Sequence, residues 1–175
     1  LVRGGPGVGK TTLGLHFLLE AIKNNETSLF ITLGEPEKKV KRNALRLGFD
    51  IEKVHFLDLS PEPTFFAKVE TYDIFTPAEV EREPTTKKIV ETVEKLKPNR
   101  IFLDAMTQFK FLSNDNFQFH KQSLSFLHYL QEQGATIVFT SESSKLAPDD
   151  DLQFISDSVI NLENSSLGMQ VNVSK

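Results

Sequence analysis

The chain has no cysteine, no tryptophan and only two tyrosines among its 175 residues. Without cysteine it can form neither a disulfide framework nor a thiolate metal site, so we expect a cytoplasmic location. No apolar run approaches the ~18 residues that a transmembrane helix needs, and the N-terminus lacks the pattern of a secretion signal. There is also no excess of positive charge: 20 Lys and Arg stand against 24 Asp and Glu, and the net charge of −4 does not favour tight non-specific binding to nucleic acid or an anionic membrane.

What the chain does have is enough apolar material for one core. Its hydrophobic share is 39%, and fifteen phenylalanines supply bulky side chains. Only three residues precede the first glycine-rich segment, and residues 171–175 resemble a strand cut off in mid-course. We therefore expect a single domain, residues 1–175, excised from a longer protein.

Helical and strand-length apolar patterns alternate along the chain. Residues 60–83 contain three prolines, show no clear period and are predicted to be irregular. Two short apolar runs joined by a polar turn, 158–162 and 169–173, predict an antiparallel hairpin. This order predicts an α/β fold with a mainly parallel sheet flanked by helices. Helices are predicted at 10–24, 36–47, 85–97 and 119–133, and strands at 28–33, 54–59, 101–104 and 135–140.

The segment from Gly4 to Thr11 has the full pattern G-x-x-x-x-G-K-[ST] between a strand remnant and an amphipathic helix. Its glycines let the backbone wrap a phosphate, and its amides and the helix terminus attract negative charge. We predict an ATP site with Mg²⁺, in which Lys10 reaches the phosphates and Thr11 binds the metal. The alternative is a glycine-rich turn that happens to precede Lys-Thr. The predicted nucleotide-binding residues here are Gly5, Pro6, Gly7, Val8, Gly9, Lys10, Thr11 and Thr12.

An aspartate follows a buried apolar strand, as the partner of such a loop usually does. Asp104 comes directly after Ile101-Phe102-Leu103. Ligands of parallel sheets bind at the carboxyl ends of the strands, where this residue falls. Asp104 is therefore predicted to share the magnesium ion with Thr11.

With these motifs in order, the chain resembles the KaiC family within the RecA-like P-loop ATPases. The loop alone is shared by many NTPase families, whereas the ordered series is more specific. The resemblance implies a RecA-like fold, ring assembly (usually as hexamers), ATP bound between subunits, and slow hydrolysis used for timing or signalling. The matching segments are 4–12, Asn43-Ala44 with Gly48-Phe49-Asp50, 102–107, Gly134 to Val138 and Ile155 to Val159.

The chain departs from the family at two places. Family members carry two adjacent glutamates that position and activate the attacking water, but here the pair is Gly34-Glu35. Glu35 is thus the predicted catalytic carboxylate, alongside Lys10; alternatively it only stabilises the following helix start. The family's clock members also carry adjacent phosphorylatable Ser and Thr, where Gln153 and Phe154 stand here. Clock-type autophosphorylation at that place is not expected.

The resemblance implies two further nucleotide contacts. Ser141, with Thr140, stands where RecA-like proteins place a γ-phosphate sensor; alternatively, these hydroxyls bond to the local backbone. Lys175 matches the first residue of a Lys-x-Arg pair that reaches the neighbouring subunit's γ-phosphate, and the arginine would lie beyond the end of this chain.

Partner preferences are less sharply marked. The basic helix after Glu35 is either a solvated face or a docking or nucleic-acid face. Residues 109–121 interleave aromatic and basic side chains, as single-strand binders do, but phenylalanine is also the ordinary core residue of this chain. The acidic loop after Ser141, including Asp149, has a local net charge of −4 and would repel phosphates. Nucleic acid is thus not the expected partner. The resemblance implies a signalling or regulatory ATPase, with ATP/ADP, further copies of the chain in a ring and a regulatory protein as partners. The alternatives are an ATP-binding interaction module and a DNA recombination or repair ATPase.

Overall fold

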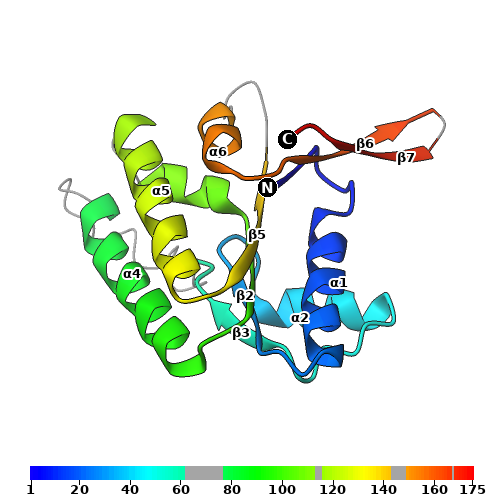
Figure 1. Cartoon of the computed structure of the whole chain (residues 1–175), viewed down its shortest axis with the longest axis horizontal. Helices are drawn as coiled ribbons and strands as arrows, with labels where there is room; N and C mark the ends of the chain where they lie inside the picture. The colour runs from blue at the N-terminus through cyan, green and yellow to red at the C-terminus, as the bar shows by residue number, and fades with distance from the viewer. Residues whose placement is uncertain (62–76, 113–115, 143–148, 167) are drawn as a thin grey trace, which may run out of the picture.

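The structure is a computed structural model that describes residues 1–61, 77–112, 116–142, 149–166 and 168–175. These residues form one sheet with the strand order β3-β2-β4-β5-β1-β6-β7 (Figure 1). All neighbouring strands are parallel except β7, which runs antiparallel to β6. The predicted α/β fold with a C-terminal hairpin is thus confirmed. The strands are β1 Val2–Arg3, β2 Ser28–Thr32, β3 His55–Asp58, β4 Arg100–Asp104, β5 Thr136–Ser141, β6 Ile160–Ser165 and β7 Gly168–Val173.

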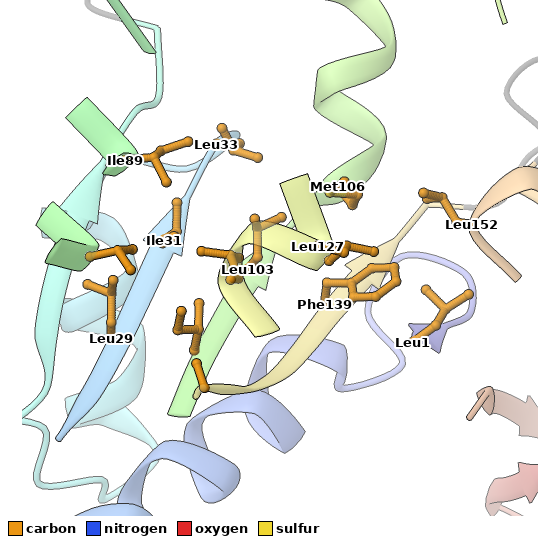
Figure 2. Close-up of a cluster of buried hydrophobic side chains, with 14 of the residues drawn as sticks. Leu1, Leu29, Ile31, Leu33, Ile89, Leu103, Met106, Leu127, Phe139 and Leu152 are labelled. Carbon is orange, nitrogen blue, oxygen red and sulfur yellow. The ribbon is translucent and has the colours of Figure 1, made fainter. Parts of the chain in front are cut away.

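Helices cover both faces of this sheet, because successive strand residues point to opposite sides. Phe30 and Phe102 face one side and join a core cluster with α1 and α2. Their neighbours Ile31 and Leu103 face the other side and pack with α4 and α5 (Figure 2). The phosphate loop and the helix that follows it therefore belong to the first face. The helical segments are α1 Lys10–Lys23, α2 Glu37–Arg46, α4 Pro77–Leu96, the 3₁₀ helix η2 Met106–Leu112, α5 Asn116–Glu132 and α6 Asp150–Ile155.

The predicted boundaries of α4 are wrong at its N-terminal end. The helix begins at Pro77 rather than at Thr85, so residues 77–83 are helical and not irregular. Proline is well tolerated in a first helical turn because its missing N–H needs no partner there. The rest of the predicted irregular segment, 62–76, lies outside the described residues. The sequence pattern also missed η2 and α6, which are too short to show a clear period.

A glycine in helix α1 packs directly against a ring on strand β4. Gly14 is buried, and a Cβ built on it would lie only 2.1 Å from the ring of Phe102. No larger residue fits there without displacing the ring or the helix. This contact sets the height of α1 above the sheet.

Helix α2 starts where β3 ends, held there by one carboxylate. Asp58 Oδ2 accepts a hydrogen bond of 2.7 Å from the backbone N–H of Glu37, and Oδ1 accepts bonds from the N–H and hydroxyl of Ser60. Burial works against the charged form, but these hydrogen bonds outweigh it and lower the pKa of Asp58 below its ordinary 3.8. The ionised carboxylate thus fixes the start of α2, just after Glu35.

None of the helices among the described residues combines the length and the apolar character that a membrane-spanning segment requires.

Candidate functional site

The phosphate loop connects β1 to α1 and passes close to strand β6. Gly4 adopts a φ of 149°, and a Cβ there would lie 2.3 Å from the backbone oxygen of Leu162. Gly9, immediately before α1, adopts a left-handed φ of 90°. Both positions therefore require glycine, one for close approach and one for the turn into the helix. The loop runs through Gly9 directly into the N-terminal end of α1, and a helix N-terminus is a favourable place for a phosphate.

Lys10 lies inside this curl. The residue is 8% exposed, and its Nζ donates hydrogen bonds of 2.8 Å to the carbonyl oxygens of Gly4 and Gly5. The Lys10 side chain therefore crosses the loop, from the first turn of α1 to the carbonyl oxygens of Gly4 and Gly5. A cation held at this place neutralises charge on a phosphate enclosed by the loop. The position agrees with the predicted role, which stays a prediction.

The structure brings the two predicted metal ligands together. The Thr11 hydroxyl donates a 2.6 Å hydrogen bond to Asp104 Oδ2, although 93 residues separate them in sequence. Thr140, from the neighbouring strand β5, donates a 2.5 Å bond to Asp104 Oδ1. Two hydroxyls thus orient one carboxylate from both sides. Because a hydroxyl has one donor and two lone pairs, Thr11 keeps its lone pairs available for a cation while it bonds to Asp104.

This donor set fits magnesium bound together with a nucleotide. Hydroxyl and carboxylate oxygens are the hard ligands that Mg²⁺ prefers, and the ion usually takes only one or two protein ligands, with the rest from phosphates and water. Among the described residues, no group of three or more His, Cys, Asp or Glu side chains could hold a metal by itself. Thr11 and Asp104 would therefore hold the ion, and the loop would hold the phosphates that complete its coordination.

The predicted catalytic carboxylate follows strand β2, whose last residue, Thr32, pairs with Asp104 of β4. Glu35 is 48% exposed at its side chain and forms a 2.6 Å ion pair with Lys39, one turn along α2. Its backbone oxygen accepts a 2.5 Å bond from the Thr32 hydroxyl at the end of β2, which anchors the main chain but leaves the carboxylate outside. Beside Gly34 lies Gln108 of η2, whose Nε2 is 3.7 Å from where a Cβ would be. The sequence reasoning missed Gln108, although it follows Asp104 by only four residues.

Ser141 has a partner in the fold that the sequence did not predict, while its role as a γ-phosphate sensor stays a prediction. It is fully buried, and its hydroxyl donates to Asp149 Oδ2 rather than to the local backbone. The guanidinium of Arg3 binds the same carboxylate through two hydrogen bonds, of 2.8 and 3.1 Å. Asp149 is 2% exposed, so its charge is neutralised inside the protein and does not belong to an acidic loop surface. The residues between this pair, 143–148, lie outside the described part of the chain.

The sequence reasoning also missed this ion pair. A bidentate Arg–carboxylate contact has strong directional bonds, and here it joins the residue before the phosphate loop to the start of α6. Its signal was weak because Arg3 and Asp149 lie 146 positions apart. Only the adjacency of β1 and β5 brings them together.

The β6–β7 hairpin extends from the edge of the molecule next to the phosphate loop (Figure 1). A Cβ built on Gly9 would lie 3.6 Å from the terminal methyl group of Met169, near the start of β7. Lys175 lies at the other end of β7, where its Nζ donates to the backbone oxygen of Phe154 at 3.2 Å. This chain's own hairpin thus presents Met169, and not Lys175, to its loop.

The segments considered for nucleic-acid binding are partly engaged within the fold. Lys39 and Lys41 of α2 form ion pairs with glutamates one turn earlier. Phe119 is 1% exposed, and Phe109 packs against Phe126 in the core. Phe117 is 77% exposed. The packing supports the interpretation of Phe109 and Phe119 as core residues rather than as a stacking surface.

Comparisons with known proteins agree on one family. The model of the family described as "ATPase: KaiC" matches residues 1–173 of this chain. The circadian clock oscillator protein KaiC of Parasynechococcus marenigrum is 28% identical, over 94% of this chain and 33% of its own length. The circadian clock protein KaiC3 of Synechocystis sp. is 29% identical over 81% of this chain and 28% of its own length. KaiC2 of the same organism is 26% identical over 95% and 30%. The chain thus spans about a third of the length of these relatives.

Proposed function

This chain belongs to the KaiC family of RecA-like ATPases, and from that premise we propose that it binds ATP with magnesium and hydrolyses it slowly, as a signalling or regulatory ATPase. The observation that carries the proposal is the Thr11–Asp104 hydrogen bond of 2.6 Å, directly beside Lys10 and the glycine loop. It supports a site in which phosphate-binding and metal-binding groups converge at the end of one helix.

The proposed division of labour follows from the positions of these groups. The loop amides and Lys10 bind the phosphates and neutralise their charge. Thr11 and Asp104 hold the metal ion, and Thr140 is a positioning residue that fixes the orientation of Asp104. When bound, magnesium supplies a positive charge that stabilises the transferring phosphoryl group. Glu35 orients the attacking water and accepts its proton.

Slow turnover follows from the surroundings of Glu35. The Lys39 ammonium binds one oxygen of the carboxylate, Oε1, at 2.6 Å, and a positive charge at that distance makes the carboxylate a weaker base toward water. Exposure to solvent also weakens the electrostatic advantage that a closed site gives to a base. Position 34 is a glycine, so it provides no second carboxylate that could activate the water in place of Glu35.

The test is steady-state phosphate release with Mg-ATP. Lys10→Ala should abolish saturable Mg-ATP binding, measured by calorimetry. Glu35→Gln should preserve binding and lower the rate roughly 10²-fold or more, the low end of what a general base contributes. An unchanged rate in Glu35→Gln would remove Glu35 from the mechanism, and wild-type binding in Lys10→Ala would remove the nucleotide site itself.

A second function, an ATP-binding interaction module without useful hydrolysis, is favoured by the glycine at position 34. The outer side of α2 offers a surface for a regulatory partner protein, since Leu45 and Leu47 are 65% and 62% exposed next to Arg42 and Arg46. Single-turnover assays separate the two functions. ATP that stays bound and uncleaved over many hours identifies the interaction module, whereas ADP formation at a constant slow rate identifies the ATPase.

We also propose that the working state is a ring, as the family resemblance implies. Alternate residues of β7, Met169, Val171 and Val173, are each about 60% exposed and form an apolar row along the outermost strand of the described sheet. A neighbouring subunit would cover this row next to the phosphate loop. Light scattering with and without Mg-ATP tests this. Val171→Lys should reduce the assembled fraction, whereas Asn172→Lys, on the other side of the strand, should not.

A further inference from the structure

A large cavity lies on the side of the sheet opposite α1, away from the phosphate loop. Its volume is about 760 Å³, within the usual range for sites of small organic molecules. Helices α4 and α5 and the 3₁₀ helix η2 form its walls. Much of the wall is aromatic or aliphatic, contributed by Ile89, Val90, Met106, Phe109, Phe119 and Phe126.

Two hydroxyl groups in the lining of this cavity lack partners. Ser123 is 2% exposed, and neither its Oγ nor the Tyr129 hydroxyl has a hydrogen-bond partner among the described residues. A buried hydroxyl without a partner is unfavourable, because it has given up its hydrogen bonds to water. A protein retains such groups most readily where something else bonds to them. Burial, together with the nearby Glu94 charge, raises the pKa of Tyr129 above its ordinary 10, so its hydroxyl is protonated and a donor at neutral pH, as in any tyrosine.

The cavity also has a charge gradient along α5. Lys121, Ser125 and Tyr129 are spaced four residues apart, so they form one row about 12 Å long. Lys121 lies at the N-terminal end of this row. A second lysine, Lys110, places its Nζ 5.5 Å from the centre of the ring of Phe119, which also lines the cavity. Glu94 lies near Tyr129, at the other end. A bound anionic group is therefore favoured at the Lys121 end and repelled at the Tyr129 end.

From the cavity, its two unpartnered hydroxyls and this gradient, we propose that it binds a small aromatic organic anion. The anionic head lies at Lys121, and the aromatic body packs among the phenylalanine rings. Polar substituents on the body accept hydrogen bonds from Ser123 and Tyr129. Ring contacts of this kind favour aromatic over aliphatic bodies, because edge and offset stacking add to the area that is buried. The site is separate from the nucleotide loop and does not depend on whether the chain hydrolyses ATP.

The probe is anilinonaphthalene sulfonate, an aromatic anion that fluoresces when shielded from water. It is titrated into the chain with Mg-ATP at saturation, so that the nucleotide site is filled. We expect a saturable signal with one site per chain that further ATP does not displace. A signal that ATP removes, or one that does not saturate, overturns the proposal.

Matched variants then locate the probe. Ser123→Ala should raise its Kd roughly threefold to tenfold, the range that one hydrogen bond supports. Ser28→Ala removes the other buried serine hydroxyl without a described partner, which does not line the cavity, and should leave the Kd unchanged. Equal effects of these two variants would overturn the proposal.

The charge gradient has its own pair of variants. Lys121→Gln should raise the Kd roughly threefold and make it less sensitive to salt, as expected for a partly exposed charge. Lys95→Gln, on α4 and outside the lining, should do neither. Ser125→Trp should fill the cavity and abolish the signal while circular dichroism and the unfolding temperature stay near wild type. Undiminished probe binding in a folded Ser125→Trp protein contradicts the assignment.

Discussion

Replacing Gly34 by glutamate would restore the pair of adjacent carboxylates that KaiC-like ATPases carry after the second strand. The position accepts a side chain. Gly34 is exposed and does not adopt a left-handed φ, and an added Cβ would make only ordinary contact, 3.7 Å from Gln108 Nε2. We therefore expect the free energy of unfolding to stay within about 0.5 kcal/mol of the wild type, as for other surface substitutions.

The expected gain is catalytic. A well-placed general base contributes roughly 10²–10⁴-fold, and an exposed Glu35 paired with Lys39 realises only part of it. A carboxylate at position 34 would lie beside the Gln108 amide, which can donate to it and fix its orientation. Steady-state phosphate release should then rise roughly tenfold or more, with little change in the Kd for Mg-ATP.

Gly34→Gln is the matched control, because its side chain has nearly the same shape but no basic oxygen pair. It should release phosphate at the wild-type rate. The reasoning is refuted if Gly34→Glu folds, binds Mg-ATP as the wild type does and still releases phosphate no faster than Gly34→Gln.

Three further changes test the fold and the site. Gly14→Ala should lower the free energy of unfolding in urea by about 1–3 kcal/mol, because its Cβ would overlap the Phe102 ring. Asp58→Ala should lower it by about 0.5–2 kcal/mol at pH 7, as loss of a helix cap does. Because folding lowers the pKa of Asp58, the difference in unfolding free energy between wild type and Asp58→Ala is fully present above the ordinary pKa of 3.8. It is lost as the pH falls through the pKa of the folded state. Urea unfolding at a series of pH values measures this loss. Lys39→Gln should free Glu35 and raise phosphate release by up to about fivefold, since an exposed ion pair is worth at most ~1 kcal/mol; a rate independent of Lys39 would mean that the pair does not restrain the base.

The sequence was informative wherever the signal is continuous along the chain. The phosphate loop could be located because its glycines and Lys10 stand in one short pattern with a helix behind it. Asp104 could be predicted to meet Thr11 because both follow parallel strands, whose carboxyl ends share one edge of the sheet. The hydrogen bond between them confirms that the two meet, while their binding of a metal stays a prediction.

Contacts set by strand order were not predictable in the same way. The Arg3–Asp149 pair and the Thr140–Asp104 bond depend on which strands lie side by side. Strand β5 lies between β4, which precedes it in sequence, and β1, which is far from it in sequence. Hydrophobic periodicity determines which face of a strand is buried, but not which strand is next to it. The early start of α4 at Pro77 was missed for a local reason, since Pro77 and Pro84 lie within the helix and obscured the helical pattern.

The packing of α1 against β4 sets the distance between the two predicted metal ligands, Thr11 and Asp104. Gly14 and Thr11 lie three residues apart on one side of the helix, and Phe102 and Asp104 lie two apart on one side of the strand. The two pairs therefore form successive rungs between the same two elements, the lower apolar and the upper polar. A substitution that moves α1 away from the Phe102 ring also increases the distance between the Thr11 hydroxyl and the Asp104 carboxylate. The packing of Gly14 against Phe102 therefore limits how far the two predicted metal ligands can move apart.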